Sequence, residues 1–194
     1  MARTHSAAEE VIRAQVTVTF MRMEHPPTDP APEFPPGVSV RTLPSCSVAQ
    51  YRRLYNTVGA PYLWWLRRLM PDNELAALLS RGSVSIHVVS IDGEEAGFYE
   101  LDSGYWPAVN LSYFGLMPHA VGKRFGFAFL RHAVDTAFGM GARVLTVNTC
   151  TADHPRALPT YLRAGFRTLR QVRELWNVPL RLGMQIPDRL RDGA

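Results

Sequence analysis

HPRALPTYLRAGF, residues 154–166, is the stretch that decides the fold. Pro155 near its start and Gly165 near its end are typical of the two ends of a helix, so the sequence predicts a helix over Pro155–Ala164. The apolar run RVLTVNTC, Arg143–Cys150, lies before it and predicts a buried strand. A strand, a bend and a helix therefore follow one another in this part of the chain.

Upstream of this unit, the sequence predicts a β-hairpin, a third strand and a helix. The hairpin strands, Ser83–Ile91 and Glu95–Asp102, alternate in hydropathy and are joined by Asp92-Gly93, a strong signal for a two-residue turn. The third strand covers Ala108–Leu116. The helix covers Gly122–Phe138 and ends at the glycines that follow it.

Two strand signals in the first part of the chain lie on either side of a proline-rich connector. VTVTFMRM, residues 16–23, alternates like a strand, and so does Val38–Leu43. Six prolines lie from Pro26 to Pro36, which excludes regular structure and predicts a stiff, extended connector. Two helices are expected before the hairpin, at residues 47–59 and 72–80.

This order of elements predicts an α/β (α+β) fold in which helices flank a mixed, partly antiparallel sheet. With 194 residues, 46% of them hydrophobic and 20% charged, the chain can form one substantial core. We divide it into an N-terminal strand with its connector, residues 1–37, and a main domain, residues 38–194. The N-terminal strand is expected to pair with an edge of its own sheet or with a second copy of the chain, as a homodimer.

Charge and cysteine content limit the partners and the compartment of the protein. The net charge is +4 and the pI about 9.4, but the arginines are scattered, which argues against a nucleic-acid partner. The bias towards Arg, Ala and Pro is typical of a GC-rich, bacterial genome. Cys46 and Cys150 form no disulfide framework, and the glutamates in MARTHSAAEE interrupt any signal-peptide core. No apolar run is long enough for a membrane, so we expect a cytoplasmic protein without a membrane partner.

HAVGKRFGFAFL, residues 119–130, places two glycines and two basic residues before an apolar helical run. A strand that leads into a helix N-terminus presents unpaired amides and the positive end of the helix dipole, which suit a phosphate. Arg124 follows Lys123 where a Walker A loop has Ser or Thr, and no GxGxxG is present. Alone, the stretch fits a phosphate cradle and a solvated basic helical turn equally well.

Together, the two stretches resemble the GNAT superfamily of N-acetyltransferases. Residues 154–166 match its motif B, Asn-x-x-Ala-(Ile/Leu)-x-x-Tyr-x-x-x-Gly-Phe, apart from His154 in place of the Asn. Residues 121–126 are in register with its motif A loop, (Gln/Arg)-x-x-Gly-x-(Gly/Ala). Val121 and Arg124 depart from that pattern and Gly126 matches it. The resemblance covers roughly residues 38–166.

The resemblance implies that acetyl-CoA is held between two splayed parallel strands, here Ala108–Leu116 and Arg143–Cys150. Their backbone is expected to pair with the pantetheine arm, and the amides of residues 121–126 with the pyrophosphate. We expect Arg124 to have the negative φ of a first-turn helical residue. The implied cofactor-binding residues are Leu116, Met117, Val121, Gly122, Lys123, Arg124, Phe125, Gly126, Asn148 and His154.

Acetyl transfer to an amine needs a base for the amine and a proton donor for the departing sulfur. By resemblance, Tyr161 is the donor; the alternative is a core tyrosine. Many members of the family carry a Glu on the strand before motif A, where this chain has Asn110 and Ser112. Glu100 on the neighbouring strand is our candidate base, directly or through water. By strand alternation, Glu100 and Asp102 lie on the same face of their strand. A solvent-exposed position without a catalytic role would explain both carboxylates equally well.

Aromatic residues and one carboxylate are candidates for the acceptor pocket: Tyr62, Trp64, Trp65 and Asp102. Aromatic rings near a carboxylate suit a cationic amine with an apolar body, although core packing is the common fate of such rings. The histidines lack a ligand spacing, so no metal is expected. The sequence has no GxSxG, which argues against a hydrolase.

These features predict a transferase, an acetyl-CoA-dependent N-acetyltransferase that acts on a primary amine of a small molecule or a protein. The amine is expected to attack directly in a ternary complex. The alternative is a non-catalytic acyl-CoA sensor or interaction module, because motif A departs from the pattern and the strand carboxylate is missing. A weaker alternative, suggested by the Arg content, is an acetyltransferase associated with RNA or the ribosome.

Overall fold

Seven strands form one mixed sheet in this computed structural model, which describes residues 9–191. The strands are β1 (Val11–Met23), β2 (Val38–Leu43), β3 (Val84–Ile91), β4 (Glu94–Tyr105), β5 (Ala108–Leu116), β6 (Val144–Cys150) and β7 (Arg167–Pro179). Their order across the sheet is β2-β3-β4-β5-β6-β1-β7. Only β5 and β6 run parallel, and the other neighbouring strands are antiparallel. The predicted mixed, partly antiparallel sheet is confirmed.

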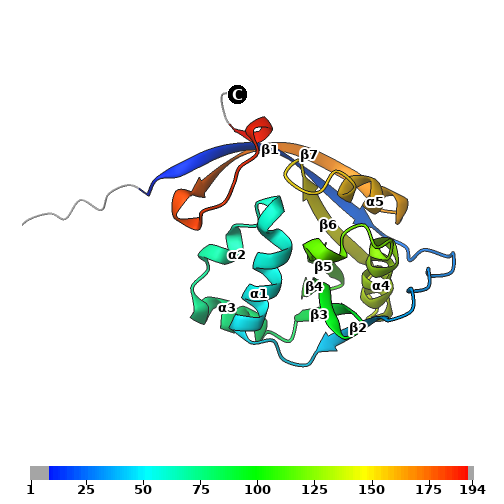
Figure 1. Cartoon of the computed structure of the whole chain (residues 1–194). Coiled ribbons are helices and arrows are strands. Elements are labelled where there is room, and N and C mark those ends of the chain that lie inside the picture. The colour runs from blue at the N-terminus through cyan, green and yellow to red at the C-terminus, as the bar shows by residue number, and fades with distance from the viewer. Residues whose placement is uncertain (1–8, 192–194) are drawn as a thin grey trace, which may run out of the picture.

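Helices lie on both faces of the sheet (Figure 1). The first face carries α1 (Val48–Gly59), α2 (Leu66–Leu69) and α3 (Asp72–Leu79), and the second carries α4 (Gly126–Gly139) and α5 (Ala157–Arg163). We call these the α1 face and the α4 face. Short 3₁₀ helices lie at Ala60–Tyr62, Pro118–Ala120, Leu180–Leu182 and Asp188–Leu190.

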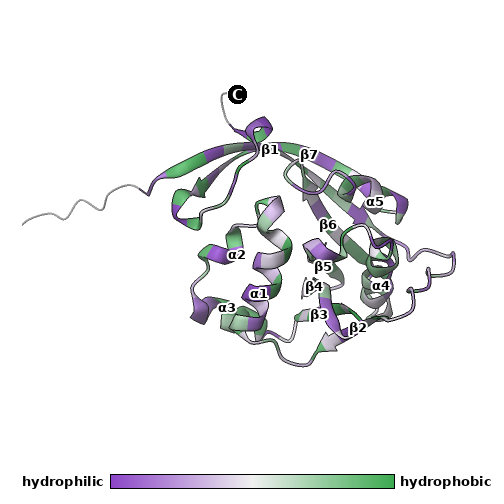
Figure 2. Cartoon of the chain, in the orientation of Figure 1, coloured by the Kyte–Doolittle hydropathy of each residue, from purple (hydrophilic) through white to green (hydrophobic). Residues whose placement is uncertain are grey.

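The alternation of the strands gives each face an apolar core of its own. Val109 and Leu111 of β5 pack with α4, whereas Phe98 of β4 packs with α1. Strongly hydrophilic residues colour α2 and parts of β7 (Figure 2). No described helix is both long and apolar enough to cross a bilayer.

Most of the predicted elements are confirmed, but several boundaries differ: β1 begins at Val11 rather than Val16, and β4 ends at Tyr105 rather than Asp102. Asp92 and Gly93 turn the β3–β4 hairpin with φ values of 50° and 86°, and β5 has the predicted bounds. The helix predicted from Gly122 begins at Gly126 instead. Gly122 and Arg124 have φ values of 87° and 65°, which a right-handed helix does not allow.

The N-terminal strand β1 lies inside the sheet, between β6 and β7. Residues 18–23 pair with β6, and residues 11–22 pair with β7 on the other side. The expected pairing at a sheet edge is therefore wrong, because residues 18–22 of this strand have partners on both sides. Residues 1–8, on which most of the signal-peptide argument rests, lie outside the described residues, as do 192–194.

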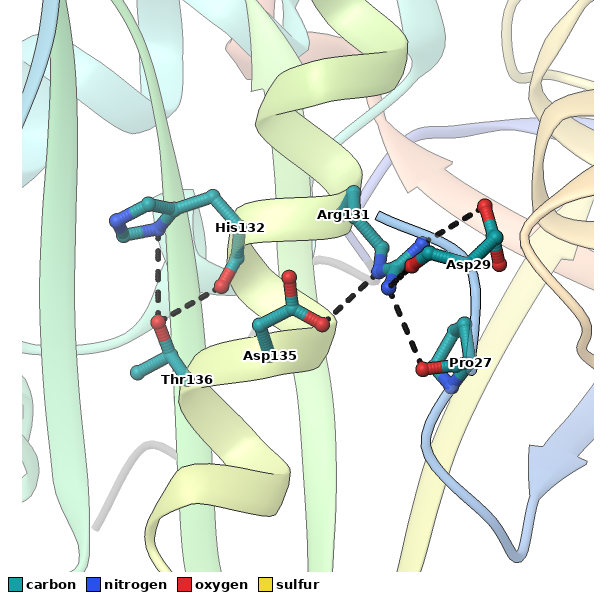
Figure 3. A network of polar contacts seen from close by, with 6 residues as sticks. All are labelled: Pro27, Asp29, Arg131, His132, Asp135 and Thr136. Carbon is teal, nitrogen blue, oxygen red and sulfur yellow. Dashed lines mark hydrogen bonds and ion pairs between the residues drawn. The ribbon is translucent and has the colours of Figure 1, made fainter. Parts of the chain in front are cut away.

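The connector from β1 to β2, residues 24–37, passes along the outside of α4 (Figure 1). Arg131 of α4 anchors it (Figure 3). The Arg131 guanidinium, 5% exposed, donates to the Asp29 carbonyl at 2.6 Å and to the Asp29 carboxylate at 3.2 Å. It also contacts the Pro27 carbonyl at 3.4 Å and Asp135 at 2.9 Å. These bonds hold a connector whose prolines cannot supply backbone donors.

Acid is expected to destabilise this fold through a buried histidine. His87 of β3 is 4% exposed, stacks on Tyr99 at 4.4 Å and is hydrogen bonded to Thr42 and Ser85. Burial, with a smaller contribution from the charge of His132, lowers the pKa of His87 from 6.5 to about 4. Between these values the unfolded chain takes up a proton that the folded chain does not. Stability is thus complete above pH 6.5 and falls, by on the order of 3 kcal/mol, as the pH drops to 4.

Urea unfolding of the wild type and His87→Asn at several pH values between 7.5 and 4.5 tests this prediction. The variant should be less stable at neutral pH, but its stability should depend less steeply on pH, because the titrating ring is gone. Parallel pH dependences in the two proteins would assign the acid sensitivity to other groups.

Candidate functional site

The parallel strands β5 and β6 separate halfway along their length. They pair from Ala108–Val144 to Leu111–Val147, and no pairing continues beyond that point. β5 nevertheless runs on to Leu116, held by β4, and β6 runs on to Cys150, held by β1. The result is the V-shaped gap between splayed strands that the sequence predicted.

Alternation along β5 decides which of its backbone groups face this gap. The Met117 amide donates to the Ala96 carbonyl at 2.8 Å, and the Met117 carbonyl accepts from the Ala120 amide at 2.9 Å. The prediction that the Met117 backbone is open to pantetheine is therefore wrong. In the antiparallel β4–β5 ladder, every second residue turns its N–H and C=O away from the partner strand. By this rule the backbone groups of Leu116 and Phe114 face the gap. Leu116 therefore remains a candidate for binding pantetheine, and Phe114 is a further candidate that the sequence analysis did not name.

The β6 arm of the gap follows the same rule. The Thr151 amide bonds to the Thr17 carbonyl of β1, so the backbone groups of Asn148 and Cys150 face β5 and the gap. The Cys150 amide donates to the Asp153 carboxylate at 2.8 Å, and the Thr149 hydroxyl donates to the same oxygen at 2.7 Å. A carboxylate therefore lies at the wide end of the gap. Sequence reasoning missed Asp153, although it follows a buried strand directly.

The loop before α4 has exposed residues and unusual backbone angles. Val121, Gly122, Lys123 and Arg124 are exposed, whereas the Phe125 side chain is buried in the core, so only the Phe125 backbone can serve a ligand. Arg124 has a φ of 65° and Phe125 is right-handed, an alternation that forms a concave set of amides. No side chain caps α4, so its first amides also point out of the helix. Positive backbone dipoles thus converge beside the gap.

The expected negative φ of Arg124 is wrong, and Arg124→Gly tests the strain that follows. A side chain in the left-handed region costs about 1 kcal/mol, which glycine avoids, so this variant should melt a few degrees higher. Lys123→Gly is the matched control, because Lys123 has no positive φ and should gain nothing. An equal or lower melting temperature for Arg124→Gly than for Lys123→Gly would contradict this account.

Tyr161 reaches the same region from α5. Its ring is 6% exposed and packs against Phe166 at 5.7 Å and Phe114 at 6.3 Å, between ring centroids. Its hydroxyl has no hydrogen-bond partner among residues 9–191. Burial, and then the charge of Asp153, raise the pKa of Tyr161 well above its ordinary value. The residue is thus both part of the core and a phenol that keeps its proton.

Glu100 of β4 is fully buried, which excludes the solvated alternative. One carboxylate oxygen accepts from the Tyr51 hydroxyl at 2.5 Å, and the other from the Arg67 guanidinium at 3.0 Å. Burial raises the pKa of Glu100, although Arg67 and Tyr51 oppose this shift. Because both oxygens are occupied, this geometry does not support Glu100 as an open base. Arg67 was not anticipated as its partner.

The structure separates the four predicted acceptor residues. Trp64 lies on the α1 face against Tyr113, 5.0 Å between centroids, and so borders the gap. Tyr62 lies near His154, whose Nδ1 accepts from the Arg156 amide at the start of α5. Trp65 packs on Trp176 at 6.5 Å in a separate apolar cluster, and Asp102 accepts from the Gly104 amide at 2.8 Å near the end of β4. Trp65 and Asp102 therefore have structural partners of their own.

No group of three His, Cys, Asp or Glu side chains within residues 9–191 is arranged to hold a metal ion. The polar groups that meet around the gap are instead backbone amides, one phenol and one carboxylate. Such groups can orient an extended polar arm, bind a diphosphate and move protons.

Solved structures with this fold include several acetyltransferases. A GCN5-related N-acetyltransferase from Sphaerobacter thermophilus is 16% identical with a TM-score of 0.62, and the match covers 88% of this chain and 53% of that one. One from Kribbella flavida is 15% identical with a TM-score of 0.59, covering 84% and 60%. The chain thus spans little more than half the length of these two proteins. At such low identities the likeness shows the fold alone.

A model of the acetyltransferase (GNAT) family matches residues 51–166, more than half of the chain. A search of curated proteins found no match. The matched residues include α1, both arms of the gap, the loop before α4 and Tyr161. The chain therefore belongs to the GNAT family of acetyltransferases.

Proposed function

We propose that this acetyltransferase transfers the acetyl group of acetyl-CoA to a primary amine of a small molecule or a protein. The observation that carries the proposal is the splayed gap, with the backbone of Phe114 and Leu116 on one arm and Asn148 on the other. The amides at the start of α4 suit the pyrophosphate, and the gap suits the pantetheine arm. The Tyr161 ring packs against Phe114 of the β5 arm, which suits it as the proton donor to the departing sulfur.

The chemistry fits a direct transfer in a ternary complex. Acetyl-CoA supplies an activated thioester. The amine nitrogen bonds to the acetyl carbon, the carbon–sulfur bond breaks, and the amine loses a proton. Tyr161 gives its phenol proton to the departing sulfur and takes a proton back from solvent, to which the base releases the proton lost by the amine. Burial raises the pKa of Tyr161, so the phenol is protonated before the transfer.

We propose Asp153, rather than Glu100, as the base. Asp153 lies at the open end of the gap, whereas Glu100 is enclosed by Tyr51 and Arg67. Burial raises the pKa of Asp153, although the hydrogen bonds from the Thr149 hydroxyl and the Cys150 amide oppose this shift. Glu100 instead positions Arg67, whose guanidinium lies 5.4 Å from the centre of the Tyr113 ring.

Replacing each carboxylate by its amide distinguishes these roles. Asp153→Asn should lower turnover by about 100-fold and remove the acidic limb of the pH–rate profile. Glu100→Gln should instead destabilise the fold, by about 3 kcal/mol or more, because Arg67 loses its charged partner, and it should leave the pH–rate profile in place. The reverse pattern, with the acidic limb lost in Glu100→Gln, would make Glu100 the base.

A non-catalytic acyl-CoA sensor is the second candidate. Two observations favour it: Arg124 stands in a strained conformation at the glycine position of motif A, and the buried Glu100 is held in an ion pair. Such a protein would bind acetyl-CoA without turning it over.

Turnover decides between the two. The full chain is incubated with acetyl-CoA and a panel of primary amines, and the free thiol is measured. Amine-dependent thiol release is the expected result. Tight acetyl-CoA binding without release for any amine would favour the sensor.

A further inference from the structure

Trp64 lies on the α1 face of the gap, against its β5 arm. The far edge of its indole lies beside β5, where a Cβ added to Gly115 would be 3.6 Å from Cη2. The ring of Tyr113, also on β5, lies 5.0 Å from the indole. The Trp64 side chain therefore lies along the β5 arm of the gap.

The indole is fixed in this position by its surroundings. Its ring lies 5.4 Å from Tyr55 and 6.1 Å from Phe98, in addition to its contact with Tyr113. A Cβ on Gly59 would come within 2.3 Å of the Trp64 Cβ, so only glycine allows this approach. Leu63, directly before Trp64, has a φ of 56°, which sets the turn that aims the ring. Packing therefore holds the Trp64 ring in one position beside the gap.

The opposite face of the gap is closed as well. Phe114 and Tyr161 lie there, in the core beneath α4 and α5. Two cavities, of about 530 and 220 Å³, are both lined by Glu24 and His25, which belong to the connector after β1. Neither cavity includes Trp64 or Tyr161 among its lining residues. Neither of these two cavities therefore extends the gap.

From this geometry we infer that Trp64 sets the acyl-chain length, so that the site accepts acetyl and rejects longer acyl groups. The inference rests on the proposed function. An acyl chain longer than acetyl has to extend from the thioester towards one face of the gap. On the α1 face it meets the indole, and on the α4 face it meets packed aromatic rings. One methylene in an apolar pocket changes selectivity by roughly 10- to 200-fold.

The test is the affinity of the full chain for acetyl-CoA, butyryl-CoA and hexanoyl-CoA, measured by calorimetry without an acceptor. The wild type should bind acetyl-CoA at least about tenfold more tightly than hexanoyl-CoA. Trp64→Ala should reduce this ratio to about threefold or reverse it, because the removed ring leaves room for the chain. Trp65→Ala is the matched control: it removes an adjacent tryptophan that packs elsewhere, and it should keep the wild-type ratio.

The test compares the ratio of the acetyl-CoA and hexanoyl-CoA affinities within each variant. Because unfolded protein lowers both apparent affinities equally, this ratio does not depend on the fraction of folded protein. If Trp64→Ala does not fold, Trp64→Leu keeps an apolar side chain at this position and should shift the ratio in the same direction. An unchanged ratio in the Trp64 variants, or a wild type that binds all three thioesters equally, overturns the inference and leaves the proposed function intact. A wild type that binds none of them overturns both.

Discussion

Gly126→Val should weaken acetyl-CoA binding by about 100-fold or more while the protein remains folded. Gly126 is the first residue of α4, where the backbone has to approach the pyrophosphate closely. Loss of two charge-assisted backbone bonds weakens binding by about 100-fold or more. Within the protein, an added Cβ would meet only the Leu116 Cδ1 at 3.5 Å, an ordinary contact. Calorimetric titration of acetyl-CoA, with a melting curve for the fold, measures both effects.

Gly139→Val is the control at the other end of the same helix. A Cβ at Gly139 meets nothing within 4 Å, so this variant carries a similar helix-propensity change without blocking the loop. It should bind acetyl-CoA like the wild type. If folded Gly126→Val bound acetyl-CoA with wild-type affinity, residues 119–130 would not form a pyrophosphate site and would only begin an ordinary helix.

Tyr161→Phe should lower turnover by about 10²- to 10⁴-fold, because it removes the proton donor to the departing sulfur. The phenylalanine ring keeps the packing against Phe114 and Phe166, so the melting temperature and acetyl-CoA affinity should change little. Single-turnover kinetics measures the chemical step directly. Tyr105→Phe is the control, since Tyr105 is 86% exposed in the β4–β5 turn. An unchanged chemical step in Tyr161→Phe would leave Tyr161 as a core residue only.

Local signals predicted the elements of the gap well. β5 has the bounds expected from its pattern, and Gly165 follows α5 with a φ of 104°, as the glycine at a helix end requires. The predicted negative φ of Arg124 was wrong because residues other than glycine rarely adopt the left-handed conformation that Arg124 has here. Only the surrounding loop and helix can hold an arginine there.

The remaining differences come from contacts between distant parts of the chain. β1 pairs with strands more than 120 residues away, and no local pattern encodes that register. The pairing of Glu100 with Tyr51 and Arg67 joins β4 to α1 and α2. The Met117 amide is occupied by Ala96 because β5 continues its ladder for one residue beyond the strand. Strand alternation predicts which side chains share a face, but it does not predict their partners.

Binding of acetyl-CoA to the wild-type chain tests the central claim most directly. If the splayed strands and the loop before α4 form the site, acetyl-CoA at about a hundred times its dissociation constant should stabilise the fold by roughly 2.7 kcal/mol. Titration calorimetry should then show one site per chain, with weaker binding in Gly126→Val. No heat of binding and no change in melting temperature at millimolar acetyl-CoA would contradict the account.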